Sequence, residues 1–135
     1  NATIPLSEHR DQCRVMMAKI KRDRFASLSA VWIGRFDVDA DRRMGDELFV
    51  NVQARNGSVR VAVAEKTDGY HGSLRKSDSL PGFSFDDCIP ITGDQVRAPV
   101  RFRKAAIDKL PRDLDLCLLF ELTRGEIFAY EWGNE

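Results

Sequence analysis

The chain has 135 residues, of which 43% are hydrophobic and 31% charged, and its 21 Lys and Arg balance its 21 Asp and Glu. This length fits one domain, and the composition excludes a disordered tail. Zero net charge provides no field to attract a polyanion, and the longest apolar run, Leu116 to Phe120, is far too short to span a bilayer, so we expect neither nucleic acid nor a membrane as partner.

Residues 1–13 are expected to be a leading segment or linker that precedes one β-sandwich domain over residues 14–135. Because the chain opens at Asn1 without a basic and apolar leader, we expect it to derive from a longer or processed protein. The segment from Ser7 to Lys21 has helix-forming composition, and Ser7 can serve as its N-cap. The residues from Phe25 to Val38 instead have the composition of a strand.

A hairpin is predicted around Asn56-Gly57, because this pair tolerates the positive φ angles of a tight turn. Apolar and polar residues alternate on both sides of it, as in half-buried strands. We therefore expect Leu48–Ala54 to pair with Ser58–Glu65. The predicted inward residues are Leu48, Val50, Val52 and Ala54, then Val59, Val61 and Val63.

The C-terminal third shows the same alternation. One segment places Val96, Ala98, Val100 and Phe102 on its inner face, and the next places Leu114, Leu116, Leu118, Phe120 and Leu122 there. After Thr123-Arg124-Gly125, a last strand with Phe128, Tyr130 and Trp132 inward predicts a second hairpin. Seven to eight short strands without helices between them predict an all-β fold, an antiparallel β-sandwich or jelly roll.

Three carboxylates, Asp86, Asp87 and Asp94, lie close in sequence and are the candidates for acid–base or nucleophilic chemistry. Glycoside hydrolysis needs two carboxylates a few ångströms apart, which spacing in sequence does not establish. Asp next to Gly and Pro more often caps turns, and we favour that interpretation. A calcium ion held by these oxygen-rich loops is a third interpretation. We therefore predict no catalytic residue, no metal ligand and no cofactor other than calcium.

Aromatic rings are the candidates for glycan contact, because flat ring faces bind the C–H surfaces of sugars. Strand parity makes Tyr130 and Trp132 core residues. Tyr70 and His71 lie in a glycine-flanked loop where a ring has no obvious core to fill. Tyr70 either contacts a glycan or fills its own loop, and loop filling is the somewhat commoner arrangement. Together with Trp32, Tyr70 and His71 form the predicted carbohydrate-binding set.

Basic residues and cysteines offer weaker signals. Arg97, Arg101 and Arg103 share one strand face, where they either bind an acidic polysaccharide or pair across strands, and pairing is the commoner arrangement. Cys13, Cys88 and Cys117 form neither a CxxC motif nor an even disulfide set, so we interpret them as ordinary thiols. A dyad of Cys88 with His71 is disfavoured, since the preceding carboxylates would raise the thiol pKa.

Several phrases resemble a sandwich module found beside the catalytic part of bacterial glycoside-hydrolase-like proteins, especially those with a five-bladed β-propeller like that of fructosidases and arabinanases. The most distinctive phrase is Pro81-Gly82-Phe83-Ser84-Phe85-Asp86-Asp87-Cys88. The others are Lys21-Arg22-Asp23-Arg24-Phe25-Ala26-Ser27-Leu28, Leu48-Phe49-Val50-Asn51-Val52, Gly57-Ser58-Val59-Arg60-Val61, Gly93-Asp94 and Ile127-Phe128-Ala129-Tyr130. The resemblance covers residues 15–132.

This resemblance implies a non-catalytic accessory module whose partners are a glycan or polysaccharide and an adjacent catalytic domain of the same chain, in a secreted or periplasmic protein. It also favours strand over helix for Val15 to Lys21. The chain departs from the family pattern at Arg24, where the family-like phrase has Gly, and in an insertion from Tyr70 to Ser79. The alternatives are a small glycan-acting hydrolase that uses Asp86, Asp87 and Asp94, or a purely structural or oligomerising sandwich.

An outward apolar cluster is predicted on the C-terminal strands. Alternation places Cys117, Leu119, Ile127 and Ala129 on the face opposite the core. Such a cluster either docks on another domain or subunit, or is covered by another part of the same chain.

Overall fold

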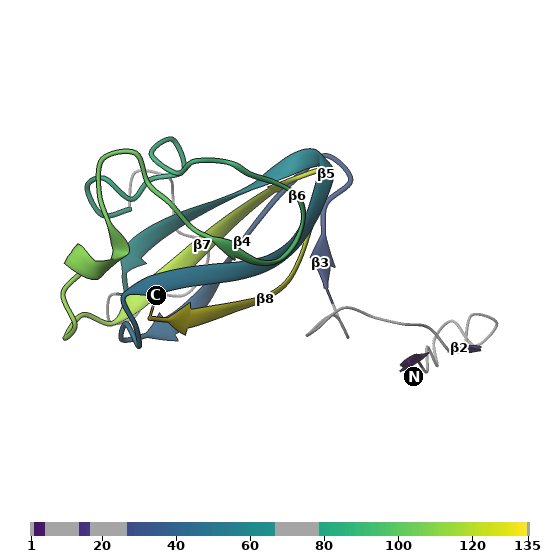
Figure 1. The fold of residues 1–135 in the computed structure, drawn as a ribbon, viewed down its shortest axis with the longest axis horizontal. Helices are drawn as coiled ribbons and strands as arrows, with labels where there is room; N and C mark the ends of the chain where they lie inside the picture. Colours follow the sequence, from purple (N-terminus) through teal and green to yellow (C-terminus); the bar gives the residue numbers. More distant parts are fainter. Residues whose placement is uncertain (1, 5–13, 17–26, 67–78, 135) are drawn as a thin grey trace.

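The computed structural model describes residues 2–4, 14–16, 27–66 and 79–134, and this part of the chain is an all-β, antiparallel structure (Figure 1). Two short strands, β1 (Ala2–Ile4) and β2 (Arg14–Met16), form a sheet of their own. Six strands form the main sheet, and within these residues the only helical element is a 3₁₀ turn, η3 (Ile107–Lys109). The predicted all-β class is confirmed.

The central strand of the main sheet is β5 (Glu47–Glu65), which pairs on both of its edges. On one edge its first half pairs with β8 (Glu126–Gly133) and its second half with β7 (Leu116–Thr123). On the other edge it pairs with β6 (Ile91–Pro99). Beyond β7 lies β4 (Ile33–Asp41), and beyond β8 lies the two-residue β3 (Leu28–Ser29).

Both predicted hairpins are wrong, because neither turn signal reverses the chain into a paired hairpin. Asn56 and Gly57 lie inside the single strand β5, and β7 and β8 follow one another along β5 instead of pairing together. Gly57 does not have the positive φ of a tight hairpin turn. It is required for close approach, since a Cβ on Gly57 would lie 1.7 Å from the carbonyl oxygen of Thr123.

Three segments that lie side by side in the sheet change direction next to one another, and we call this row of bends the bend line. It comprises residues 30–32 between β3 and β4, residues 56–57 within β5, and residues 124–125 between β7 and β8. Two hydrogen bonds join residues 30–32 to the middle bend at residues 124–125: the Ala30 N–H donates to the Gly125 carbonyl at 3.0 Å, and the Arg124 N–H donates to the Trp32 carbonyl at 2.7 Å. The bends let the sheet curl around its core in a nearly barrel-shaped arrangement (Figure 1).

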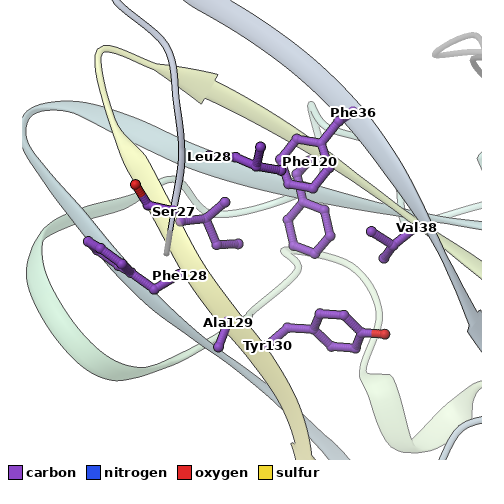
Figure 2. Close-up of a pocket in the computed structure, with 9 residues that line it drawn as sticks. Ser27, Leu28, Phe36, Val38, Phe120, Phe128, Ala129 and Tyr130 are labelled. Carbon is purple, nitrogen blue, oxygen red and sulfur yellow. The ribbon is translucent and has the colours of Figure 1, made fainter. Parts of the chain in front are cut away.

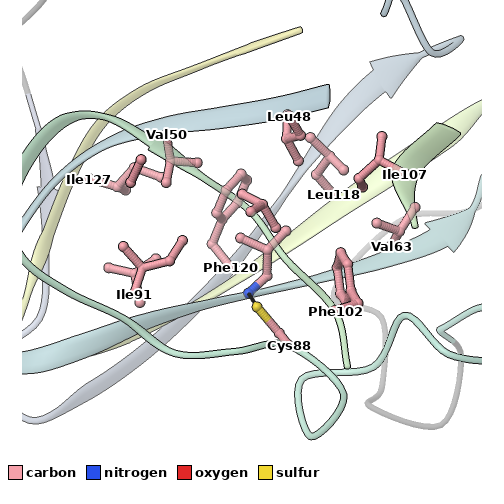
Figure 3. Close-up of a cluster of buried hydrophobic side chains, with 14 of the residues drawn as sticks. Leu48, Val50, Val63, Cys88, Ile91, Phe102, Ile107, Leu118, Phe120 and Ile127 are labelled. Atoms are coloured by element: carbon pink, nitrogen blue, oxygen red, sulfur yellow. Dashed lines mark hydrogen bonds between the residues drawn. The ribbon is translucent and has the colours of Figure 1, made fainter. Parts of the chain in front are cut away.

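The core lies inside this curl, and alternation identified its residues on β5 and β7 correctly. All seven inward residues predicted on β5 are buried, as are Leu116, Leu118, Phe120 and Leu122 on β7. Of the residues predicted inward on the β6 segment, Ala98, Val100 and Phe102 are buried, whereas Val96 is only half-buried and lies outside the core cluster. Figure 3 shows part of this cluster. Cys88 packs in the same cluster, where its Sγ accepts a hydrogen bond from the Val61 N–H at 3.3 Å. Burial raises the pKa of the Cys88 thiol, which agrees with an inert core residue.

The last strand departs from the predicted alternation at one residue. The partners of Asn51 and Val52 on β8 are Ala129 and Ile127, so Phe128 is the extra residue of a β-bulge. The bulge places Ile127 in the main core, where Phe128 was expected, while Tyr130 and Trp132 pack against the core as predicted. The outward position predicted for Ile127 is therefore wrong.

The predicted outward apolar cluster is covered within the chain at Cys117 and Leu119. Leu119 is 4% exposed and forms a second buried cluster with Ala62, Ala64 and Phe85. Phe85 belongs to the loop of residues 80–90, which runs along β5: the Val63 N–H donates to the Phe83 carbonyl, and the Leu80 N–H donates to the Val63 carbonyl. Leu119 is thus not part of an open docking surface.

Of the strand expected from Phe25 to Val38, the structure describes residues 27–38, which form β3 and the start of β4 with the bend at residues 30–32 between them. Of the segment from Ser7 to Lys21, the structure describes residues 14–16, which are strand and not helix. The remainder of that segment lies outside the described residues.

Candidate functional site

The bend line carries the most exposed apolar residues of the sheet. Three consecutive side chains at the turn into β4 face solvent: Val31 is 81% exposed, Trp32 70% and Ile33 67%. A bend forces successive side chains outward instead of alternating them between two faces. We call Trp32, its neighbour Arg124 and the cavity that Arg124 lines the corner site.

The Trp32 ring is partnered across the bend line by Arg124. The guanidinium carbon of Arg124 lies 5.5 Å from the ring centroid, within the range of a cation–π contact. Arg124 adopts a positive φ of 46°, so backbone geometry at the bend places this side chain beside the ring. The hydrogen bond from its N–H to the Trp32 carbonyl fixes the same two residues through the main chain.

A surface cavity of about 320 Å³ with a mixed lining lies at the bend line, and its lining includes Val31, which precedes Trp32, and Arg124, which contacts the Trp32 ring. Its polar groups are the carboxamides of Gln53 and Asn56, the Arg124 guanidinium and the Glu126 carboxylate, and Ala30 and Val31 supply apolar surface. The Ser27 hydroxyl donates to Glu126 at 2.9 Å, and the Arg55 N–H donates to the Gln53 side-chain oxygen at 3.0 Å. The corner site thus combines an exposed ring with hydrogen-bond donors and acceptors.

Of the predicted carbohydrate-binding residues, only Trp32 lies in the described part of the chain. Tyr70 and His71 lie outside it, so their contribution stays a prediction. The sequence did not identify Arg124 as the partner of Trp32, nor Gln53 and Asn56 as lining residues of the adjoining cavity. The Thr123-Arg124-Gly125 and Asn56-Gly57 turn signals marked the right positions, but the shared level of the two bends was not visible in either signal.

The three candidate carboxylates each have a different partner. Asp86 lies 3.6 Å from Arg60, and Asp94 pairs with Arg55 at 3.0 Å. Asp87 accepts a hydrogen bond from the Ser84 hydroxyl at 2.8 Å within one turn, the capping role favoured from the sequence. The corner cavity is not lined by Asp86, Asp87 or Asp94, and neither is the second cavity, which opens between β4 and β8.

The arginines of the β6 segment pair within the chain. Arg97 stacks 3.5 Å from the Phe49 ring centroid and bonds Glu131 at 2.9 Å. Arg101 forms an ion pair with Glu47 at 3.0 Å. Arg103 donates to the main-chain carbonyl of Asp86 at 2.6 Å. Pairing with acidic side chains is thus seen for Arg97 and Arg101, whereas Arg103 bonds the main chain.

A buried carboxylate, Glu121, lies on the outer face of the sheet between two arginines. Arg35 donates to one of its oxygens at 2.8 Å and Arg60 donates to the other at 2.8 Å, while the Glu121 side chain is 3% exposed. Burial alone would raise the pKa of Glu121, but hydrogen bonds from Arg60 and Arg35 outweigh it and the pKa falls below its usual value. With both oxygens engaged, Glu121 is a structural anion.

A second cavity, of about 300 Å³, opens between β4 and β8, and we call it the slot (Figure 2). Its walls are apolar and come from several strands, with Leu28 on β3, Phe36 and Val38 on β4, Phe120 on β7, and Ala129 and Tyr130 on β8. The slot was not predicted, because alternation assigned Phe120, Phe128 and Tyr130 to a closed core and Ile127 and Ala129 to the opposite face of the sheet.

Comparisons of the chain with protein-family models, curated proteins and solved structures find no match. Among the described residues, no group of three or more His, Cys, Asp and Glu side chains is arranged to hold a metal ion. The same residues contain no helix with the length and apolar character that a membrane crossing requires.

Proposed function

We propose that the chain is a non-catalytic β-sandwich accessory module of a carbohydrate-active enzyme and that it binds glycan at the corner site. The observation that supports this proposal is the exposed Trp32 ring against Arg124, which also lines a cavity with Gln53, Asn56 and Glu126. A ring face can stack on a sugar, and the neighbouring polar groups can orient its hydroxyls. Tyr70 and His71 stay in the proposal as further contacts.

The enzyme alternative has less support. A small hydrolase that uses Asp86, Asp87 and Asp94 would need two of them to converge on a shared cavity, whereas each has its own partner. The sugar class is left to experiment, because the corner site offers both a cation and an anion.

The test is glycan binding by affinity electrophoresis against a panel of neutral and acidic polysaccharides, followed by calorimetry on those that retard the chain. We expect Trp32→Ala to weaken binding at least tenfold. Met44→Ala is the matched control, since Met44 is 76% exposed and lies outside the corner site. Tyr70→Ala tests the loop separately. If no polysaccharide binds, or if Trp32→Ala binds as well as the wild type, the corner proposal is wrong.

A second candidate function, docking on an adjacent domain, is favoured by the exposed aliphatic side chains of Val31 and Ile33 beside Trp32. The two functions respond differently to Ile33→Lys. This change leaves the Trp32 ring and the corner cavity in place, so glycan binding should persist. An apolar interface would instead lose affinity, which sedimentation of the chain with its neighbouring domain would detect.

A further inference from the structure

The corner site offers a cation and an anion, and these two groups differ in the partners that they already have. The Glu126 carboxylate accepts a hydrogen bond from the Ser27 hydroxyl at 2.9 Å. The Arg124 guanidinium contacts the Trp32 ring, but among the residues that the structure describes it has neither a hydrogen-bond acceptor nor an ion-pair partner. The N–H donors of this exposed arginine are therefore available to a ligand.

The lack of an acceptor distinguishes Arg124 from the other arginines whose side chains are described. Each of those donates to a main-chain carbonyl or pairs with a carboxylate, as Arg101 does with Glu47. The set comprises Arg35, Arg42, Arg43, Arg55, Arg60, Arg97, Arg101, Arg103 and Arg112. Arginine stays charged at any pH relevant to proteins, and its hydrogen bonds to anions are stronger than those between neutral groups. An anion at Arg124 would therefore add a strong interaction without displacing an existing one.

Arg124 is also held in place before a ligand arrives. Its main-chain N–H donates to the Trp32 carbonyl at 2.7 Å, and its guanidinium carbon lies 5.5 Å from the centroid of the Trp32 ring. A side chain that is already positioned loses less conformational freedom on binding than a free surface arginine. Because the ring and the cation are presented together, a single ligand can contact both.

A uronic acid matches this pair of groups. The C–H face of its sugar ring can stack on the Trp32 indole, and its planar carboxylate can accept two N–H groups of one guanidinium. The carboxylate is attached directly to the sugar ring, so ring and charge lie close together, as Trp32 and Arg124 do; a sulfate ester is separated from the ring by a further oxygen. A neutral sugar would leave the Arg124 guanidinium without an acceptor.

We propose that the glycan bound at the corner site contains a uronic acid, whose carboxylate accepts hydrogen bonds from Arg124 while its ring stacks on Trp32. The carboxamides of Gln53 and Asn56, in the same cavity, bind the sugar hydroxyls. This inference rests on the proposed glycan binding and names the class of sugar that is bound.

The test compares polyuronates with their own carboxyl-reduced forms, in which each carboxylate has become a hydroxymethyl group and the linkages are unchanged. Alginate, polygalacturonate and glucuronoxylan are the polyuronates, and dextran sulfate is the sulfated polymer for comparison. Affinity electrophoresis with the full chain detects binding, and calorimetry measures it. We expect at least one polyuronate to bind at least tenfold more tightly than its reduced form, because only the carboxylate engages the Arg124 cation.

Protein variants assign this preference to one side chain. Arg124→Gln removes the charge and should weaken binding of the polyuronate at least tenfold, while binding of the reduced polymer changes less than about twofold. The matched control Arg42→Gln removes the same charge from an exposed side chain outside the corner cavity and should leave both affinities unchanged. Trp32→Ala should weaken binding of both polymers. The comparison of the two polymers on the wild type holds even if Arg124→Gln does not fold.

The outcomes separate this inference from the proposed function. Equal binding of every polyuronate and its reduced form, full affinity for the polyuronate in a folded Arg124→Gln variant, or binding of dextran sulfate without any polyuronate would overturn the uronic acid inference. Glycan binding at the corner site would stand in those cases if Trp32→Ala still weakened it. Absence of binding to every polysaccharide, neutral or acidic, would overturn both.

Discussion

Gly57→Ala tests the close approach of the two bends on which the sheet depends. The new Cβ would lie 1.7 Å from the Thr123 carbonyl oxygen and 2.8 Å from that of Arg124. Because non-bonded heavy atoms settle roughly 3.5 Å apart, the bends of β5 and β7 would have to separate by roughly 2 Å. The adjacent ladder, in which Ser58 pairs with Thr123, would be distorted as well.

We expect a loss of roughly 3 kcal/mol, at the upper end of the usual cost of overpacking. In urea denaturation followed by circular dichroism, a slope of about 2 kcal/mol per molar urea converts this loss to a fall of about 1.5 M in the midpoint. Gly93→Ala is the control, since Gly93 has a φ of 83° and no atom within 4 Å of an added Cβ. It should cost only the backbone strain, about 1–2 kcal/mol.

A Gly57→Ala variant no less stable than Gly93→Ala would refute the reasoning. The Thr123 carbonyl would then not lie against Gly57, and the observed continuous path of β5 through Asn56 and Gly57 would lose its physical explanation.

Three further outcomes follow from buried groups on the outer face of the sheet. Leu119→Lys should destabilise the chain by about 3 kcal/mol or more, because Phe85 covers the site. The control Ile89→Lys, at a position 45% exposed, should change stability to urea little. A stable Leu119→Lys variant would mean that Leu119 lies on an open docking face. The pKa of Glu121 is lower in the folded than in the unfolded state, so the stability that this carboxylate contributes is present above the unfolded pKa and is lost as the pH falls through the folded pKa. Glu121→Gln should therefore be less stable than the wild type at pH 7. It should also lose less stability than the wild type between pH 7 and pH 3. Burial, and to a smaller extent the nearby Asp37 carboxylate, raises the pKa of Cys117 to about 11. About one in a thousand of these thiols is then ionised at pH 8, so a thiol reagent should label Cys117 only after the chain unfolds. Fast labelling of the native chain would contradict the buried position of Cys117.

Local periodicity was sufficient to identify the inward residues of β5 and β7. Val59, Val61 and Val63 are buried because side chains of a strand alternate between its two faces, which needs no knowledge of the partner strand. The pairing could not be predicted in the same way. Asn56-Gly57 indicates a change of direction, but whether the flanking segments pair together or each finds a distant partner depends on residues 116–133.

The missed features of the candidate sites have the same origin. The bulge at Phe128 exchanges an expected inward residue for Ile127, and composition carries no signal for an extra residue in one strand. Arg124 approaches Trp32 because two bends share a level of the sheet, and Phe85 covers Leu119 because a loop returns to β5. Each is a tertiary contact between residues that are individually unremarkable in the sequence. The exposure of Trp32 likewise depends on the bend, so the sequence could propose the ring but not its setting.

The pairing of β5 with the last strands has a consequence for how the chain is made. The partner strands β7 and β8 begin at Leu116, long after β5 ends at Glu65. At about 5–20 residues per second, a ribosome takes roughly 3 to 14 seconds to move from Glu65 to Gly133. During that time β5 has left the ribosome with apolar residues on both faces, and β6, at Ile91–Pro99, is the first of its partner strands to emerge. Early pairing of β6 with β5 would shield the nascent strand until its later partners arrive.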